Sequence, residues 1–448
     1  MKNVLTGAVL AFVFARSGAA QSLTLRDAVD EALSKNPAIA AADARQQAAA
    51  AREAEARAGR FPLIDVSESA TRGNNPVFVF GSLLEQGRFA PRHFDPVFLN
   101  APPAMTNYRS SITARFAIFD RFRTSTAAGQ GANGVDRASL ELDDARQRIR
   151  ADVVARYYGV LVAGEKVAVT KEAVGAAEAD AKAARDRFEQ GLLVESDALS
   201  ADVQVATLRQ RLIAAEGEQA IARAALATLL QRPRRDDVSI AGTIPSTLPA
   251  SAQNEPDLDA AIAHALASRA PVRIAALAAS DAQLRLTAER GTALPRVDAV
   301  GTAGASGATF GRRNSDYTGA IAVTIDLFDR ARPARIAEAR AGIDAARAGD
   351  TMARDAVTME VITAWQRLRT ARESASVAAA AVEQAQAAAR IVRDRYEHGL
   401  TTITEQLRAQ TALVSARFEL LAARYESVVA HAELLRATGD LNDVQPFI

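Results

Sequence analysis

A six-residue motif, Arg-Phe/Tyr-Glu-x-Gly-Leu, occurs twice in this chain of 448 residues, and it constrains the fold more than any other feature. Arg-Phe-Glu-Gln-Gly-Leu occupies residues 187–192, and Arg-Tyr-Glu-His-Gly-Leu occupies residues 395–400. Each copy ends a long helical pattern, and a glycine directly after a helix adopts the left-handed conformation without a steric penalty. We therefore expect a tight turn between two long helices at both places, and hence a duplicated helical hairpin.

The helices that precede these turns are predicted to be long, over residues 122–190 and 330–398. Apolar residues recur every seven positions in both, which is typical of left-handed coiled-coil packing. These positions are Val153, Val160, Val167, Val174, Ala181 and Phe188 in the first helix, and Val361, Leu368, Ala375, Val382, Ala389 and Tyr396 in the second. A return helix is predicted after each turn, over residues 196–231 and 402–438.

Four short segments change from the helical period to an alternation of apolar and polar residues, which is typical of strands. They cover residues 61–71, 108–119, 295–304 and 317–328. Each is about ten residues long, the length that a tilted strand needs to cross a bilayer. Residues 74–107, between the first two strands, have no steady period, and we expect a long loop there.

The predicted elements repeat in the same order over residues 21–233 and 257–440: helix, two strands, long helix and return helix. Residues 234–256 are rich in Pro, Ser and Thr and are predicted to be a linker, and residues 441–448 form a C-terminal tail. Residues 1–20 are predicted to be a signal peptide, with Lys2, an apolar run and the small residues Gly18-Ala19-Ala20 before the cleavage site. A short buried or anchoring helix is the alternative.

Composition excludes several classes of function. The chain has no cysteine, so disulfides, thiolate metal sites and cysteine nucleophiles are excluded. A net charge of +1 argues against nucleic acid as a partner, which would require clustered basic residues. No phosphate-binding loop or catalytic dyad is present, and His93, His264, His398 and His431 are scattered. We therefore expect no enzyme activity, no cofactor and no metal site.

Beyond the first 20 residues there is no run of about 18 apolar residues, so a transmembrane helix is not expected. If the chain crosses a membrane, it must use the four strands, since open strand edges are not tolerated in lipid. Four strands are too few to close a barrel, because the smallest membrane barrels have about eight. Several copies would have to contribute strands to one barrel. A soluble four-stranded sheet that caps a helical bundle is the alternative.

The leader, the doubled order of elements, the Phe-Asp-Arg sequence before each long helix and the doubled turn motif together resemble the TolC-type outer-membrane efflux channels. The similarity covers essentially the whole mature chain. It implies a mainly α fold with a small β part. The duplicated coiled-coil hairpins would form an α-barrel tunnel through the periplasm, and the four strands would contribute to a trimeric, twelve-stranded transmembrane β-barrel.

The resemblance also implies a function and partners. The chain would be the outer-membrane channel component of a tripartite efflux or type I secretion system, giving substrates passive exit from periplasm to exterior. Its partners would be the other two copies of a homotrimer, outer-membrane lipid, a periplasmic adaptor protein and an inner-membrane pump. Residues 74–107 would lie outside the cell or fold over the barrel mouth, and variable surface decoration is the alternative. The alternative is a periplasmic helical-hairpin adaptor or scaffold that does not span the membrane.

The two turns are the candidate functional site, because the turn regions of the family line the periplasmic entrance and meet the adaptor. The candidate docking residues are Gly191, Leu192, Leu193, Val194, Gly399, Leu400, Thr401 and Ile403. The entrance or gate candidates are Glu195, Asp197, Tyr396, Glu405 and Arg408.

Only part of the family's gate pattern is present at these positions. Tyr396 matches the tyrosine of the family's locking network, and Glu405 matches a carboxylate of its acidic rings. Arg408 and Thr401 stand where a second carboxylate and the network arginine are expected. Simple helix capping is the alternative role for the turns, and a solvated helix face is the alternative for Glu405.

Overall fold

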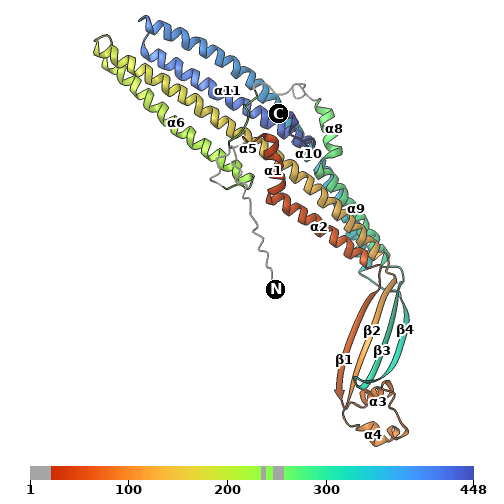
Figure 1. The fold of residues 1–448 in the computed structure, drawn as a ribbon. Coiled ribbons are helices and arrows are strands. Elements are labelled where there is room, and N and C mark those ends of the chain that lie inside the picture. Colours follow the sequence, from red (N-terminus) through yellow and green to blue (C-terminus); the bar gives the residue numbers. More distant parts are fainter. Residues whose placement is uncertain (1–21, 234–238, 246–256, 448) are drawn as a thin grey trace, which may run out of the picture. The chain divides into compact units, whose positions relative to one another are not determined.

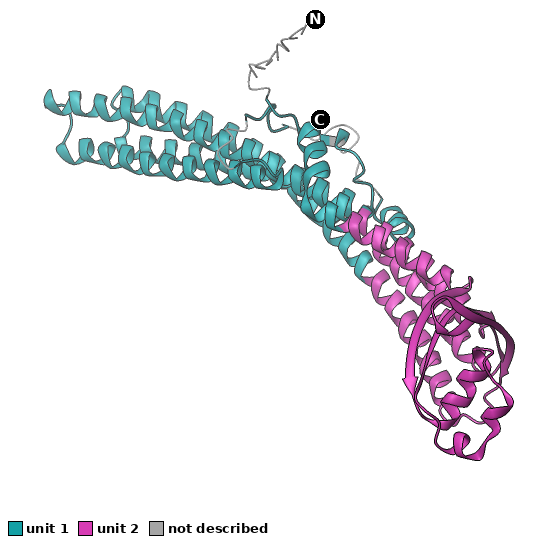
Figure 2. Cartoon of the chain, turned by 60° about the horizontal axis from the view of Figure 1, so that its bottom comes forward, with its two compact units in different colours: residues 1–41, 143–269, 356–448 teal, residues 42–142, 270–355 magenta. Residues whose placement is uncertain are grey.

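The computed structural model describes residues 22–233, 239–245 and 257–447, and it is mainly helical with one four-stranded sheet. This confirms the predicted fold class, mainly α with a small β part. The chain divides into two compact units, which Figure 2 colours separately. Unit 1 comprises residues 1–41, 143–269 and 356–448, and unit 2 comprises residues 42–142 and 270–355. The predicted signal peptide and most of the predicted linker lie outside the described residues.

Unit 2 contains the sheet, whose strands are antiparallel and lie in the order β1-β2-β3-β4 (Figure 1). The strands are β1 (Leu63–Gly73), β2 (Met105–Phe119), β3 (Arg296–Thr309) and β4 (Arg312–Thr324). Their register places apolar residues opposite one another, as along the row Val66, Ile112, Ala303 and Tyr317. Polar residues are matched in the same way, as along the row Asp65, Thr113, Thr302 and Thr318. One face of the sheet is therefore apolar and the other is polar.

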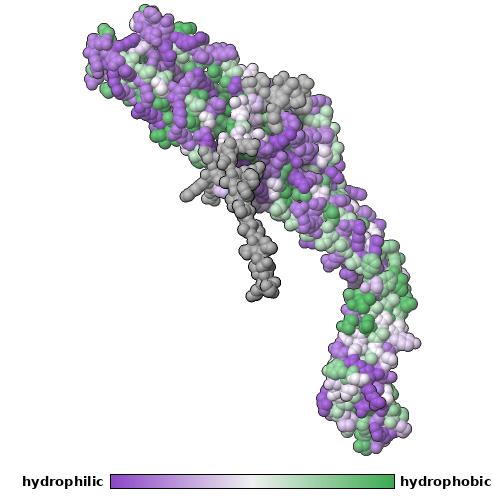
Figure 3. All heavy atoms as spheres, viewed as in Figure 1, coloured by the Kyte–Doolittle hydropathy of each residue, from purple (hydrophilic) through white to green (hydrophobic). Residues whose placement is uncertain are grey.

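The apolar face of the sheet is uncovered. Six of its larger side chains are more than half exposed, namely Ile64, Val66, Ile112, Tyr317, Ile321 and Val323. Figure 3 shows hydrophobic side chains gathered over the strands. A sheet that caps a helical bundle would bury this face, because burial of apolar surface is the main favourable term in folding. An exposed patch of this kind instead marks contact with an apolar medium or another surface.

The turn between β3 and β4 is shorter than the sequence predicted. We expected strands over residues 295–304 and 317–328 with a turn region between them. The structure continues β3 to Thr309 and begins β4 at Arg312, which leaves only Phe310 and Gly311 in the turn. Glycine and, to a lesser degree, alanine are depleted in strands in general, so the glycine- and alanine-rich end of β3 did not give a strand signal. Strand β4 ends at Thr324, four residues before the predicted end.

Residues 74–107, predicted as a loop, contain three short helices, so that prediction was wrong. They are α3 (Pro76–Glu85), the 3₁₀ helix η1 (Pro91–Phe94) and α4 (Pro96–Asn100). Each begins with proline, whose fixed φ suits the first helical turn. The Asn75 side chain caps α3 by accepting hydrogen bonds from the backbone N–H groups of Val77 and Phe78. Helices this short leave too few turns for a helical period to be recognised.

The remaining helices are α1 (Leu25–Lys35), α2 (Pro37–Ala58), α5 (Arg123–Glu189), α6 (Glu195–Leu229), α8 (Leu258–Ser268), α9 (Ala270–Gly291), α10 (Arg332–Glu397) and α11 (Ile403–Thr438). The long helices α5 and α10 have residues in both units. Among the described residues, no helix combines the length and the apolar character needed to cross a membrane.

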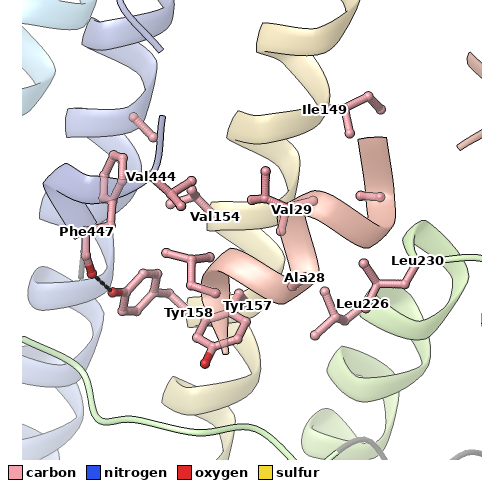
Figure 4. Packing of buried hydrophobic residues seen from close by; sticks show 14 of the residues in the cluster. Ala28, Val29, Ile149, Val154, Tyr157, Tyr158, Leu226, Leu230, Val444 and Phe447 are labelled. Carbon is pink, nitrogen blue, oxygen red and sulfur yellow. Dashed lines mark hydrogen bonds between the residues drawn. The ribbon is translucent and has the colours of Figure 1, made fainter. Parts of the chain in front are cut away.

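The main core of unit 1 gathers side chains from α1, α5, α6, α11 and the C-terminal residues (Figure 4). The Tyr157 hydroxyl of α5 donates a hydrogen bond to the Leu23 carbonyl at 3.0 Å. The neighbouring Tyr158 hydroxyl donates to the Phe447 carbonyl at 2.6 Å (Figure 4). The predicted C-terminal tail is therefore a packed part of this core, in which Leu441 and Phe447 are buried.

His431 of α11 is buried beside this core, with 7% of its surface exposed. Its ring centroid lies 5.3 Å from that of Phe447. Neither ring nitrogen has a hydrogen-bond partner among the described residues. Burial, with a smaller contribution from the positive charge of Arg372, lowers the pKa of His431 from 6.5 to about 4. The folded protein therefore favours the neutral imidazole.

We predict that His431 makes unit 1 sensitive to acid. Its stabilising contribution is complete above pH 6.5 and is lost as the pH falls towards about 4, because the unfolded chain takes up the proton first. The difference between the two pKa values corresponds to about 3 kcal/mol of unfolding free energy. Urea unfolding followed by the fluorescence of Trp365, the chain's single tryptophan, would measure it in wild type and in His431→Leu. The variant should lose most of this pH dependence, whereas the exposed-site control His264→Asn should keep it; equal pH profiles for wild type and His431→Leu would contradict the prediction.

Candidate functional site

The two repeated turns have the same backbone geometry in the structure, and both lie in unit 1. At the first, the N–H of Gly191 donates to the Phe188 carbonyl at 2.8 Å, and the N–H of Leu192 donates to the Arg187 carbonyl at 2.9 Å. At the second, Gly399 donates to the Tyr396 carbonyl at 3.0 Å, and Leu400 donates to the Arg395 carbonyl at 2.8 Å. This pair of bonds is the Schellman motif, which satisfies carbonyl groups that the end of a helix leaves free.

Glycine is required at both turns by backbone conformation. The φ angle is 71° at Gly191 and 70° at Gly399, in the left-handed region. An added Cβ atom would meet no other atom within 4 Å at either position. The constraint is therefore conformational and not one of space, so it disfavours any residue that carries a Cβ atom, Asn and Asp less than the others.

The return helices begin differently after the two turns. Helix α6 starts at Glu195 with Val194 as its N-cap, which offers no side-chain hydrogen bond. Helix α11 starts at Ile403 with Thr402 as its N-cap, and the Thr402 hydroxyl accepts a hydrogen bond from the backbone N–H of Glu405. Glu195, Asp197 and Glu405 all lie in the first turn of their helices, where negative charge interacts favourably with the helix dipole.

Three apolar side chains are exposed at the turns. Leu192 is 72% exposed, Leu400 is 67% exposed, and Val194 is also exposed. Leu193 and Thr401 are half-buried. Leu192 and Leu400 are therefore the side chains of the predicted docking set that present the most apolar surface.

Ile403 does not belong to the exposed docking surface, contrary to the expectation from the sequence. It is 1% exposed and packs in a core with Val174, Ala177, Ala181, Ala184, Ala201, Val205 and Leu208. Because Ile403 is the first residue of α11, it holds the second turn against the first hairpin. The apolar pattern of the sequence marked Ile403 correctly as a residue of the turn region, but it did not distinguish a surface residue from a core residue.

Tyr396 connects the second turn with the first. Its ring packs against the same core, and the guanidinium carbon of Arg187 lies 4.9 Å from the ring centroid. A cation over an aromatic face is attracted by the negative charge of the ring face. The Tyr396 hydroxyl is buried and has no hydrogen-bond partner among the described residues. The structure therefore places Arg187, which the sequence analysis did not select, beside the tyrosine.

Glu405 and Arg408 form an ion pair on α11, with Oε1 and Nη1 at 2.8 Å. Both side chains are more than half exposed. The arginine stands one helical turn after the glutamate and neutralises its charge locally. This position therefore carries a paired carboxylate, which differs from a ring of free carboxylates.

Polar contacts also connect the two hairpins along the return helix α11. Gln410 donates to the Asp180 carboxylate, Arg417 pairs with Glu172 at 2.9 Å, and Gln204 donates to the Thr411 hydroxyl at 3.2 Å. No pattern in the sequence marked these residues as site candidates. The sequence could have pointed to Asp180 through its position directly before the seam residue Ala181. Among the described residues, no cluster of three or more His, Asp or Glu side chains could hold a metal ion.

We predict that Gly191→Ala and Gly399→Ala weaken their turns. Each forces a Cβ-bearing residue into the left-handed region, which costs about 1–2 kcal/mol. Hydrogen exchange of the amides around each turn should accelerate, by about tenfold for 1.4 kcal/mol. The matched control is Gly175→Ala in the interior of α5, where the added Cβ also meets no other atom. This control should be neutral or stabilising, because alanine is the better helix former; equal effects at Gly175 and Gly191 would contradict the prediction.

The model of the family described as outer membrane efflux protein matches residues 28–231 and 248–440. Protein CyaE of Bordetella pertussis is 27% identical over 424 residues, which cover 94% of this chain and 84% of that protein. Outer membrane efflux protein BepC of Brucella suis is 26% identical over 348 residues, which cover 75% of this chain and 73% of that protein. The structure of the outer-membrane channel OprN matches with a TM-score of 0.79 and 20% identity, over 93% of this chain and 90% of that chain, which shows a shared fold.

The comparisons confirm the resemblance to TolC-type channels. The matched family consists of outer-membrane transport channels and is not a class of enzymes. Its members act in efflux or secretion systems together with adaptors and inner-membrane pumps. The protein is accordingly an efflux or secretion channel component located in the outer membrane, with its helical tunnel in the periplasm. The chain belongs to the outer membrane efflux protein family.

Proposed function

We propose that three copies of this chain form one passive exit duct, whose helical turns dock onto a periplasmic adaptor that is coupled to an inner-membrane pump. The observation that carries the proposal is the four-stranded sheet with an uncovered apolar face. The duct itself supplies no energy, so transport depends on the partner pump.

The edges of the sheet support assembly from several copies. Within the described residues, β1 pairs only with β2, and β4 pairs only with β3. Unpaired backbone N–H and C=O groups cost several kcal/mol each in lipid. Pairing of β4 with β1 of the next copy would satisfy both edges. Three copies would close a twelve-stranded barrel, with the apolar face towards lipid and the polar face towards the lumen.

The alternative proposal, a periplasmic hairpin adaptor or scaffold, has less support. An adaptor in water would have to cover the apolar face of its sheet, and this face is exposed. The family match also covers both halves of the chain, including all four strands.

The turns offer a docking surface of mixed character. Leu192, Val194 and Leu400 provide apolar side chains, and glycines 191 and 399 shape the backbone beside them. Binding free energy becomes more favourable as a partner removes the exposed apolar surface of leucine side chains from water. We propose that these residues contact the adaptor, and that Glu195, Asp197, Tyr396, Glu405 and Arg408 line the entrance. Cations can block a channel at a ring of free carboxylates. Because Glu405 is paired with Arg408, we do not propose such a block at this entrance.

We predict that the double variant Leu192→Asp, Leu400→Asp abolishes resistance that depends on the assembled efflux system. Charged groups at the centre of the contact would be desolvated without partners, which opposes docking. Minimum inhibitory concentrations of exported compounds should fall to those of a strain that lacks the channel. The matched control Leu192→Met, Leu400→Met keeps the apolar surface and should retain resistance. Unchanged resistance in the aspartate variant would contradict adaptor docking at these leucines.

We predict that the protein runs as a heat-resistant trimer in extracts of the outer membrane, because closed strand pairing is slow to open. Denaturing electrophoresis with and without boiling measures this directly. The aspartate variant of the turns should keep the trimer, which separates failure of docking from failure of folding. A monomer in unboiled outer-membrane extracts would contradict the shared barrel.

A further inference from the structure

Helices α3 and α4 lie at one end of the sheet (Figure 1), and the end of α3 is fixed there by several hydrogen bonds. The Glu85 carboxylate accepts from the Asn107 side chain at 2.9 Å and from the Ser306 hydroxyl at 3.3 Å. The Glu85 backbone carbonyl accepts from the Asn314 side chain at 3.1 Å. The Gln86 side chain donates to the Thr106 carbonyl at 3.0 Å and to the Asn107 side chain at 2.9 Å. Residues of β2, β3 and β4 therefore hold this corner together.

All side chains of the sheet that hold this corner lie on its polar face. Residues separated by an even number of positions lie on the same face of a strand. Asn107 therefore shares a face with Thr113 on β2, Ser306 with Thr302 on β3, and Asn314 with Thr318 on β4. The segment thus folds over the polar face and leaves the apolar face free. In the proposed barrel the polar face is the wall of the lumen.

Arg109 reinforces this attachment from the same face of β2. Its guanidinium makes two hydrogen bonds of 2.8 Å to the Asp316 carboxylate and one of 3.0 Å to the Ser306 hydroxyl. Its Nη1 also lies 4.0 Å from the Glu85 carboxylate. A bidentate arginine–carboxylate pair is geometrically specific. The pair orients Ser306 and Arg109 towards the end of α3.

The segment has a small core of its own. Val79 and Leu83 are buried, and the ring centroids of Phe80 and Phe89, and of Phe89 and Phe94, are 5.0 Å apart in edge-to-face geometry. The backbone N–H of Ala90 donates to Nδ1 of the buried His93 at 2.9 Å. Aromatic pairs in this arrangement add to the stabilisation from burial. The segment is therefore an ordered element and not a surface loop of arbitrary conformation.

The segment also carries exposed apolar side chains, namely Val77, Leu84, Phe94 and Val97. We propose that residues 76–100 form a lid inside the outer mouth of the channel, and that the lids of the three copies meet through these side chains and limit the size of molecules that leave. This inference rests on the proposed function. In the closed ring all three lids lie against the lumen wall, so the occupant that faces each lid is the lid of the next copy.

The proposed lid can be tested by measuring how fast reagents added outside the cell reach the lumen. The chain has no cysteine, so a single Thr113→Cys on the polar face, farther along β2 than the lid, is a clean reporter. Intact cells are treated with a small sulfonated maleimide or with a polymer-linked maleimide, and the labelling rates are measured. We expect the small reagent to label the cysteine and the polymer reagent to label it slowly.

The anchor variant Glu85→Ala, Gln86→Ala should open the lid. We expect polymer labelling of Thr113→Cys to accelerate by at least about tenfold, equivalent to a shift of about 1.4 kcal/mol in lid closure. The control Asp65→Asn removes a carboxylate that pairs with Arg115 on the same face without a hydrogen bond to the lid, and it should leave the rate unchanged. Equal polymer labelling in the wild-type background and in the anchor variant would overturn the lid.

Cross-linking tests contact between lids. Val97→Cys should give a disulfide-linked dimer on mild oxidation, whereas Ile112→Cys on the apolar face should not. A monomer for Val97→Cys within an intact trimer would overturn contact between the lids. Failure of the proposed function gives a different result, since the heat-resistant trimer would then be absent and the small maleimide would not reach Thr113→Cys from outside.

Discussion

The seven-residue apolar seam of α5 is the interaction on which the rest of unit 1 depends. Val153 and Val160 on this seam belong to the core that receives α1, the end of α6 and the C-terminal residues. Val174 and Ala181, farther along the same seam, belong to the core that holds the two turns. One helix therefore organises both ends of the packing in this unit, because a strict seven-residue repeat keeps the same face of the helix towards its partners over its whole length. Small side chains on the seam near the turns let the helices approach closely, and Ile403 and Tyr396 fill the space that remains.

The features that could be predicted from the sequence are those with a long repeat or a unique backbone requirement. The seam residues are separated by a constant interval, so the long helices were recognisable without knowledge of tertiary contacts. Gly191 and Gly399 follow the last helical residues and have positive φ, as the Schellman turn demands. Features that depend on contacts distant in the sequence were not predictable. Helices α3 and α4 are short, and the end of α3 is held by residues of three strands. Phe447 packs in the main core of unit 1, and its carbonyl accepts a hydrogen bond from Tyr158 of α5.

The candidate site shows the same division. Sequence reasoning located the turns, and the structure places Leu192, Leu400 and Val194 at their surface. It did not separate Ile403 from them, because the first apolar residue of a return helix can face either the partner helices or the outside. It also did not find Arg187 beside Tyr396, since the two residues come from different halves of the chain and no local pattern connects them. The pairing of Glu405 with Arg408 was within reach, because residues three positions apart on a helix are neighbours.

The two faces of the sheet explain why one small β part can serve two purposes. Alternation along a strand sends successive side chains to opposite faces, so the same strands can present an apolar surface on one side and a hydrogen-bonding surface on the other. The apolar side requires a nonpolar environment, and the unpaired edges require neighbouring strands; both requirements are met together in a closed barrel in lipid. The polar side then has no need of lipid and is free to hold Glu85, Gln86 and Arg109 in a fixed arrangement. In the proposed barrel, an element of the β1–β2 connection that binds this side lies in the lumen, so the proposed control of passage at the outer mouth rests on the register of the sheet and not on a separate domain.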